Sequence, residues 1–324
     1  AGSQKYNDYS DQRWVVQSIA EYFVPAALAA KSKAAAAYLF YQTTAIRQKT
    51  MQFTRIKRQL LVLTPLLLCC LSTSLAQNRL EIQAGNADRA STFITFHSTS
   101  LQDGAYELIH PKTEEIIPLQ RLDDTTFLFF MDKKLPKDER RVYHIQSRTT
   151  PVEANVTIQQ SAEALTAYSL DKPILHYNTA TLLPKGAPKY YERSGFLHPL
   201  YSPAGQVLTD GFPKGHTHQH GVFNALVNTT FRNKKVDFWN QHDQTGTVRH
   251  QRIETLNSGH WAGGFTTTLE HLALTGEEQV VVLEEEWTVQ VYPASDYFLF
   301  DVTSVQTNIT QDTLFVNDYH YVGM

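Results

Sequence analysis

The spacing of apolar residues predicts β-strands through most of the chain. From Arg79 onward, apolar side chains recur mainly at every second position, which is the period of a strand with one buried face. Clusters of Gly, Pro, Asp and Lys separate short runs that are rich in Val, Ile, Thr, Tyr and Phe. The pattern predicts strands at residues 92–97, 106–110, 125–131, 141–146 and 155–160, and longer ones at 280–291 and 297–309.

The only helical stripe in this part of the chain covers residues 161–165, so we predict an all-β fold. A β-sandwich is favoured over a closed barrel because the predicted strands differ so much in length. A boundary near residues 161–172 would separate a small N-terminal β-domain, residues 77–165, from a β-sandwich domain, residues 173–324. The second domain is richer in His, Trp and Gly.

Residues 51–76 have the features of a secretory signal peptide in the expected order. Basic residues follow Met51, an apolar run covers residues 60–71, and small residues precede a cleavage site after Ala76. The apolar run is shorter than the roughly 20 residues of a membrane span, and Pro65 interrupts it. We therefore predict a signal peptide; a buried core helix is the alternative.

Cleavage after Ala76 would define a mature chain that starts at Gln77. That chain contains no cysteine, because Cys69 and Cys70 lie in the signal segment, where lipidation is the alternative to cleavage. Residues 1–50 are predicted to be upstream sequence outside the mature protein, with a genuine N-terminal extension as the alternative. The mature chain is predicted to be exported to the periplasm or the cell exterior.

Charge is distributed unevenly along the sequence. The whole chain has a formal net charge of −3, whereas residues 77–324 hold 20 Lys and Arg against 29 Asp and Glu. An acidic body gives no electrostatic reason to bind nucleic acid or an anionic membrane. The expected partner is a small-molecule or glycan ligand, with no stable membrane span in the mature chain.

The strongest chemical signal is the segment Gly215-His-Thr-His-Gln-His-Gly221. If it is a strand, His216, His218 and His220 project from one face, with alternate Cα atoms roughly 7 Å apart. Neutral imidazole binds Zn or Cu at neutral pH, so a metal site is one interpretation. A metal-free polar pocket and a merely structural loop are the others. The mature chain has no cysteine and no HExxH helix, so it is neither a classical zinc finger nor a zincin metalloprotease.

Other candidate site residues lie on both sides of this segment. Asp210 precedes it, and Asp237 and Trp239 follow it at a spacing that would place both on one strand face. A carboxylate beside an indole suits a sugar; a core tryptophan beside an exposed acid is the alternative. His250 adds another imidazole near aromatic residues. The acids at 284–286 would alternate faces in a strand, so they predict no acid–base pair by themselves.

Three blocks resemble a secreted bacterial family labelled "methane oxygenase PmoA". They are Pro199–Asp210, His218–Phe223 and Val236–Trp239, within a resemblance that covers roughly residues 173–324. Family members often carry a His-Pro-His-His-Arg-Gly string, in which Thr217 here stands for the proline and His220 for the arginine.

The resemblance implies a core similar to galactose-mutarotase-like β-sandwiches, with a sugar-directed site on a concave sheet face. Family members typically occur as exported proteins beside carbohydrate-degrading genes. Their cores usually continue past the point that matches Met324, so the second domain is expected to be incomplete here.

We therefore predict an exported all-β protein that acts on a carbohydrate or carbohydrate-derived ligand. His216, His218 and Asp237 are the predicted catalytic residues, and the predicted substrate-binding residues are Trp239, His220, Asp210 and His250. One alternative is a copper- or zinc-dependent oxygenase or hydrolase that uses His216, His218 and His220 as metal ligands. A non-catalytic sugar-binding protein is the other alternative.

Overall fold

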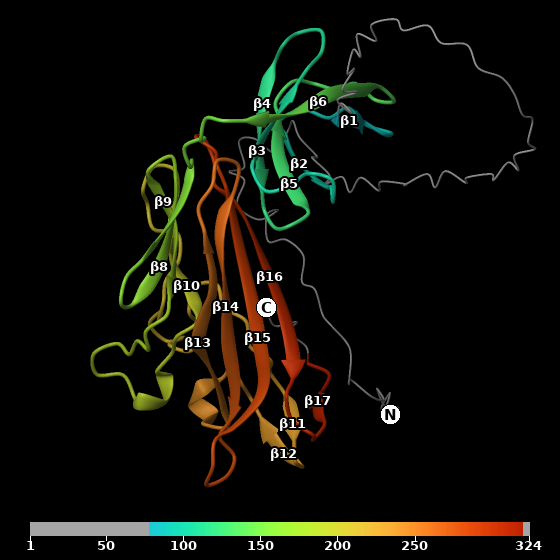
Figure 1. Cartoon of the computed structure of the whole chain (residues 1–324). Coiled ribbons are helices and arrows are strands. Elements are labelled where there is room, and N and C mark those ends of the chain that lie inside the picture. The colour runs from blue at the N-terminus through green and yellow to red at the C-terminus, as the bar shows by residue number, and fades with distance from the viewer. Residues whose placement is uncertain (1–77, 320–324) are drawn as a thin grey trace, which may run out of the picture.

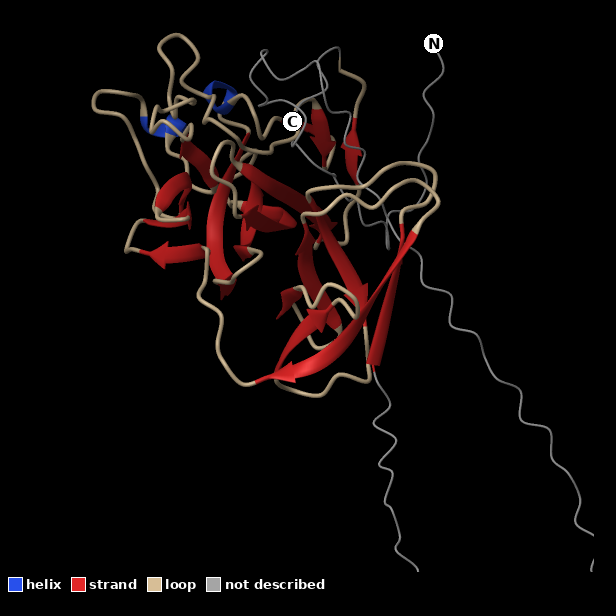
Figure 2. Ribbon diagram, turned by 90° about the horizontal axis from the view of Figure 1, so that it is seen from above, coloured by secondary structure: helices blue, strands red, loops and turns tan. Residues whose placement is uncertain are grey.

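The computed structural model describes residues 78–319. These residues form 17 strands and two single-turn 3-10 helices (Figure 2), which confirms the predicted all-β class. The predicted signal peptide at 51–76 and the upstream residues 1–50 lie outside the described residues. Among residues 78–319, no helix is both long enough and apolar enough to cross a membrane.

Six strands form a small N-terminal body. They are β1 (Asn78–Gln83), β2 (Thr92–His97), β3 (Ala105–Ile109), β4 (Ile116–Arg121), β5 (Thr126–Met131) and β6 (Arg140–Arg148). These strands make one antiparallel sheet in the order β1-β6-β3-β4-β5-β2. Its core is aromatic and aliphatic, and Leu108, Phe129 and Tyr143 are fully buried at its centre.

The second body is a sandwich of two antiparallel four-stranded sheets. One sheet has the order β10 (Phe196–Leu200), β9 (Lys172–Asn178), β8 (Ala164–Ser169), β7 (Val156–Gln160). The other has the order β13 (Gly246–Asn257), β14 (Gly263–Ala273), β15 (Val280–Tyr292), β16 (Leu299–Asn308). Side chains from both sheets, including Leu165, Tyr177, Leu269 and Trp287, share one buried core.

A third, smaller sheet and two short helices lie at one end of this sandwich. The sheet has the order β12 (Lys234–Val236), β11 (Thr229–Phe231), β17 (Leu314–Val316). The helices are η1 (Lys189–Tyr191) and η2 (Gln241–Asp243). Figure 1 shows this end pointing away from β1–β6. The connection from β10 to β11, residues 201–228, carries the histidine segment.

The boundary between the two bodies differs from the predicted one. The prediction assigned residues up to 165 to the first domain, but β7 and β8 are paired with β9 and β10 in the second body. The change of body therefore falls between Arg148 and Val156. The proposed helical stripe at 161–165 is a turn leading into β8, in which Leu165 and Ala167 pack in the sandwich core.

Hydrogen bonds tie the two bodies together. The side chain of Gln120 in β4 donates from Nε2 to the carbonyl oxygen of Ala262, at 2.7 Å. Its Oε1 accepts from the backbone N–H groups of Trp261 and Ala262. The indole N–H of Trp261 donates to the carbonyl oxygen of Pro118, at 2.7 Å. The turn before β14 is thereby fixed to the first body.

Candidate functional site

The histidine segment is a loop and not the strand that the one-face arrangement of its histidines required. The backbone N–H of His216 donates to the oxygen of Pro213, and that of Gln219 donates to the oxygen of His216. Two successive reverse turns result; Gly215 lies within the first, at a φ angle of +84°, and Gly221 follows the second, at +75°. The three histidines therefore do not share one strand face. A side chain at Gly221 would also collide with the backbone of the adjacent strand.

His220 points into the protein and is fully buried. Its Nδ1 lies 2.9 Å from the carbonyl oxygen of Gly211, and its Nε2 lies 2.8 Å from Oε1 of Gln241. Burial lowers the pKa of His220 to about 3, which favours the neutral ring, and a neutral ring donates to one of these two oxygens at a time. Both ring nitrogens face protein oxygens, which leaves neither one for a metal ion or a substrate. His220 instead joins the start of the loop to η2.

Three other imidazoles meet at the surface. The rings of His216 and His218 are 6.0 Å apart between centroids, and those of His218 and His242 are 5.8 Å apart. His242 belongs to η2 and was not among the predicted site residues; its position three residues after Trp239 is the sequence signal that could have suggested it. We call His216, His218 and His242 the histidine row.

The pKa of His218 lies below its usual value. Partial burial is the main cause, and the neighbouring His242 and His216 add to it. The charge of Asp237 opposes this shift. His218 is therefore a neutral imidazole at neutral pH, which is the form that accepts a proton. On the outer side of the row, Nε2 of His242 lies 3.2 Å from a carboxylate oxygen of Asp243.

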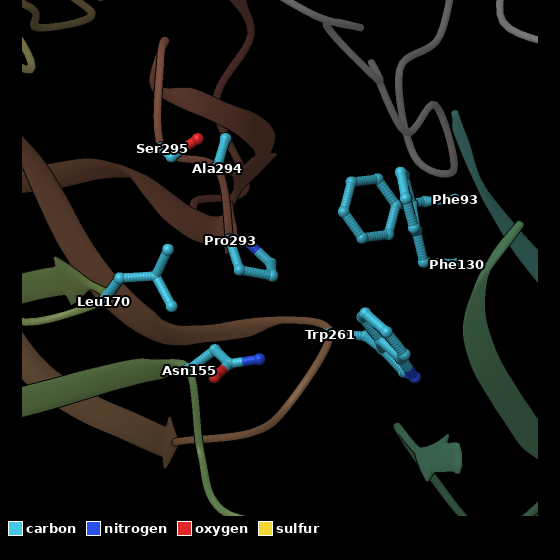
Figure 3. A pocket seen from close by; sticks show the side chains of 8 residues that line it. All are labelled: Phe93, Phe130, Asn155, Leu170, Trp261, Pro293, Ala294 and Ser295. Carbon is cyan, nitrogen blue, oxygen red and sulfur yellow. The ribbon is translucent and has the colours of Figure 1, made fainter. Parts of the chain in front are cut away.

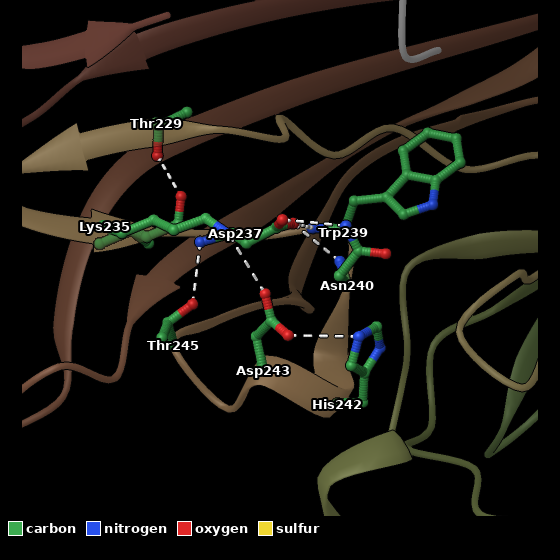
Figure 4. A network of polar contacts seen from close by, with 9 residues as sticks. Thr229, Lys235, Asp237, Trp239, Asn240, His242, Asp243 and Thr245 are labelled. Atoms are coloured by element: carbon green, nitrogen blue, oxygen red, sulfur yellow. Dashed lines mark hydrogen bonds and ion pairs between the residues drawn. The ribbon is translucent and has the colours of Figure 1, made fainter. Parts of the chain in front are cut away.

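Asp237 is buried in a turn, so the prediction that it shares a strand face with Trp239 is wrong. The strand β12 ends at Val236, and one carboxylate oxygen of Asp237 accepts from the backbone N–H groups of Trp239 and Asn240, at 3.0 and 2.8 Å. Its other oxygen accepts from the side chain of Asn240, at 2.9 Å. Figure 4 shows this turn, with the Trp239 indole and the His242 imidazole on the two sides of Asn240. Asp237 thus positions these two side chains.

The remaining predicted site residues, Trp239, Asp210 and His250, each contact a different part of the protein. Trp239 is half-buried and packs against Phe223, at 4.5 Å between ring centroids. Asp210 accepts from the backbone N–H of Phe212 and shapes the turn into the histidine loop. His250 lies on β13, with Nδ1 3.1 Å from the hydroxyl of Tyr177 in the sandwich core.

Beneath the loop lies a buried acid, Glu285, that was not among the predicted site residues. Glu285 is fully buried, with its carboxylate bonded to His271, Ser304, Trp287 and Asn224. Burial by itself raises the pKa of Glu285, but these hydrogen bonds, first of all the one from His271, hold it below its usual value. Strand alternation with Trp287 could have indicated its inward position.

A buried cation completes this centre. Arg193 is fully buried, and burial lowers its pKa to about 10, which still leaves it charged at neutral pH. Its Nη2 donates to the carbonyl oxygen of Asn224, whose side-chain amide donates to Glu285. Asn224 lies three residues after the histidine segment. A buried cation and a buried anion are both bonded to it and so hold this end of the segment in place.

A metal centre built from His216, His218 and His220 is not formed. The rings of His216 and His218 are neighbours, but His220 is turned inward and bonded at both nitrogens. Across residues 78–319, no group of three or more His, Cys, Asp or Glu side chains is arranged to hold a metal ion. The accessible chemistry is that of the histidine row itself.

Comparison with known families places this site within a matched region. Residues 164–324 match the model of DUF6807, a family of unknown function. The match begins at β8 and includes the histidine loop, η2 and the buried Glu285, but it leaves out the first body. A search of curated proteins finds no match.

Proposed function

We propose that this protein acts on a carbohydrate or carbohydrate-derived ligand at the histidine row, with His218 as the acid–base group. The observation that carries the proposal is that three imidazoles, two from the histidine segment and one from η2, lie together at an accessible surface. His218 is neutral at neutral pH and stands between the other two rings. Sugar hydroxyl groups are the proton donors and acceptors that such a base would serve.

His242 and Asp243 supply a second acid–base group beside His218. A carboxylate next to an imidazole orients the ring. One imidazole can then take a proton from the ligand while the other returns one. Asp243 also faces Lys235, at 3.4 Å, and this contact limits its rotation.

Trp239 gives the site an apolar surface next to these polar groups. The indole is half-exposed and rests on the buried ring of Phe223. The C–H face of a sugar ring can pack on such an aromatic plane. The Asp237 turn fixes Trp239 and η2 together, so that the stacking surface and His242 keep one relative position.

The sequence resemblance described above is consistent with this assignment. A family of exported proteins with a mutarotase-like core would use such a site on sugars outside the cytoplasm. We accordingly propose that the protein is secreted through the signal segment at residues 51–76, and the N-terminal sequence of the exported product tests this. Recovery of a product that begins at Ala1 would contradict it.

The activity can be tested without knowing the reaction. The protein is incubated with a panel of reducing sugars and sugar acids in D₂O, and proton NMR follows the interconversion of anomers, the exchange of C–H for C–D, and elimination. We expect one sugar class to react faster with the protein than in buffer. Complete loss is expected for His218→Gln, whereas His97→Gln, at an exposed strand position of the first body, serves as the matched control.

Two outcomes favour the alternatives. If Trp239→Ala abolishes sugar binding while no sugar in the panel reacts even with the unmodified protein, the chain is a binding protein. If activity disappears after EDTA treatment and returns with copper or zinc, the reaction is metal-dependent. Full activity of His218→Gln contradicts the proposal outright.

A further inference from the structure

A hollow of about 180 Å³ lies where the two bodies meet. Its lining includes Phe93 of β2 and Phe130 of β5 from the first body, and Trp261 and Pro293 from the second (Figure 3). Strand β13 runs from η2 to this junction, so the hollow and the histidine row lie at opposite ends of that strand. We propose that the hollow is a binding site for one neutral sugar ring, independent of the histidine row.

Aromatic rings form one continuous wall of the hollow. Phe93 and Phe130 are cross-strand partners whose ring centroids are 4.8 Å apart. Phe130 and Trp261 are 5.9 Å apart at an interplanar angle of 32°. This wall gives the hollow an aromatic side, against which the C–H groups of a sugar ring can pack.

The opposite side of the hollow combines apolar side chains, Leu170, Pro293 and Ala294, with two uncharged polar residues, Asn155 and Ser295 (Figure 3). The amide nitrogen of Asn155 donates to the carbonyl oxygen of His260, at 3.1 Å, and this bond turns its Oδ1 away from that contact. Ser295 adds a hydroxyl at the rim. None of the lining residues is Asp, Glu, Lys, Arg or His, so a charged ligand would lose its hydration without gaining a counter-ion. The lining therefore favours a neutral ligand, and Asn155 and Ser295 are the two side chains that can bond its hydroxyl groups.

Size and rigidity favour a single ring. Pockets for drug-sized ligands measure roughly 300–1,000 Å³, so this hollow holds a smaller molecule. Trp261 is fixed by its bonds to Gln120 and Pro118, and the backbone of Ala294 is bonded through its N–H to Ser169. Walls that are fixed before binding reduce the entropy that a ligand must overcome.

The test uses NMR signals of tryptophan indole N–H groups in the whole, isotope-labelled chain. Methyl glycosides of glucose, galactose, mannose and xylose are titrated, and Trp→Phe variants assign the signals. We expect at least one glycoside to shift the Trp261 signal with a roughly millimolar Kd. Methyl glucuronide, which carries a charge, should bind more weakly.

A blocking variant makes the assignment specific. Ala294→Phe fills the hollow and keeps the backbone bonds to Ser169, so we expect at least about a tenfold loss of affinity. Ala105→Phe, at an exposed position of the first body, is the matched control and should bind as the unmodified chain does.

Three results would overturn this assignment. They are an unmoved Trp261 signal with every glycoside, a shift that persists in Ala294→Phe, and equal binding of benzyl alcohol, which would mark an unselective apolar hollow. The Trp239 signal keeps the two proposals apart. A shift of Trp239 alone would support sugar binding near the histidine row while rejecting this hollow.

Discussion

At the residue scale, the side chains that stand out in the sequence divide into structural and chemical groups. The polar atoms of His220 and Asp237 are hydrogen-bonded to other residues of the protein, whereas His218 and His242 have rings that are accessible at the surface. Residue type alone does not distinguish these roles, since all are polar residues in irregular segments. Burial does, because a buried polar group must be bonded within the protein.

We expect His220→Ala to destabilise the protein. The substitution leaves the carbonyl of Gly211 and the amide of Gln241 without their partner, at a cost of about 1–3 kcal/mol. Urea denaturation measures the free energy of unfolding. His216→Ala, at an exposed position of the same loop, should stay within about 0.5 kcal/mol of the unmodified chain. Equal effects of the two substitutions would show that His220 is not the anchor of the loop.

The pH dependence of turnover should report His218. Its pKa is lowered below the usual value of about 6.5, so the ring remains a neutral base as the pH falls to that value. Activity should therefore decline only as the pH drops through the lowered pKa of His218. The acid limb of kcat/KM measures this, using whichever sugar the D₂O experiment identifies. A midpoint at or above pH 6.5 would contradict the assignment of His218 as the base.

At the scale of elements, seven strand positions could be predicted from the sequence, whereas long strands such as β13 and β14 were not among them and loop geometry could not be predicted. The predicted strand at 92–97 is β2, and the one at 280–291 lies within β15, because period-two alternation follows directly from one-sided burial. The histidine segment has the same alternation, but Gly215 and Gly221 end any strand there. His242 is brought to His218 by contacts between η2 and the segment that connects β10 to β11. These contacts depend on tertiary packing, so no local sequence pattern predicts them.

The turn at Asp237 offers a test at this scale. Asp237→Asn keeps an oxygen for the N–H groups of Trp239 and Asn240, whereas Asp237→Ala removes it. We expect the Ala variant to lose about 1–3 kcal/mol of stability and most turnover, and the Asn variant to keep the fold. Because the Asp237 charge raises the pKa of His218, the Asn variant should also move the acid limb to lower pH. An unchanged acid limb would show that the charge of Asp237 does not act on the pKa of His218.

At the scale of the whole molecule, two bodies with separate cores are joined through a few polar contacts and the aromatic hollow. Gln120 makes three of these contacts with residues 261–262, and no local pattern in the sequence marks it as a junction residue. Its side chain holds the turn that carries Trp261. The coupling between the bodies should therefore depend strongly on this one amide.

Gln120→Ala should weaken that coupling without unfolding either core. The substitution removes three hydrogen bonds and leaves the N–H groups of Trp261 and Ala262 and a carbonyl with no partner, at a cost of about 1–3 kcal/mol. Scanning calorimetry should then resolve two transitions or one broadened transition, because the small body loses support from the sandwich. Gln146→Ala, which breaks an exposed bond within the first body, is the control and should leave the calorimetric profile unchanged. A single, equally sharp transition for Gln120→Ala would mean that the aromatic contacts alone couple the bodies. In that case the substitution would also leave sugar binding in the hollow unaffected.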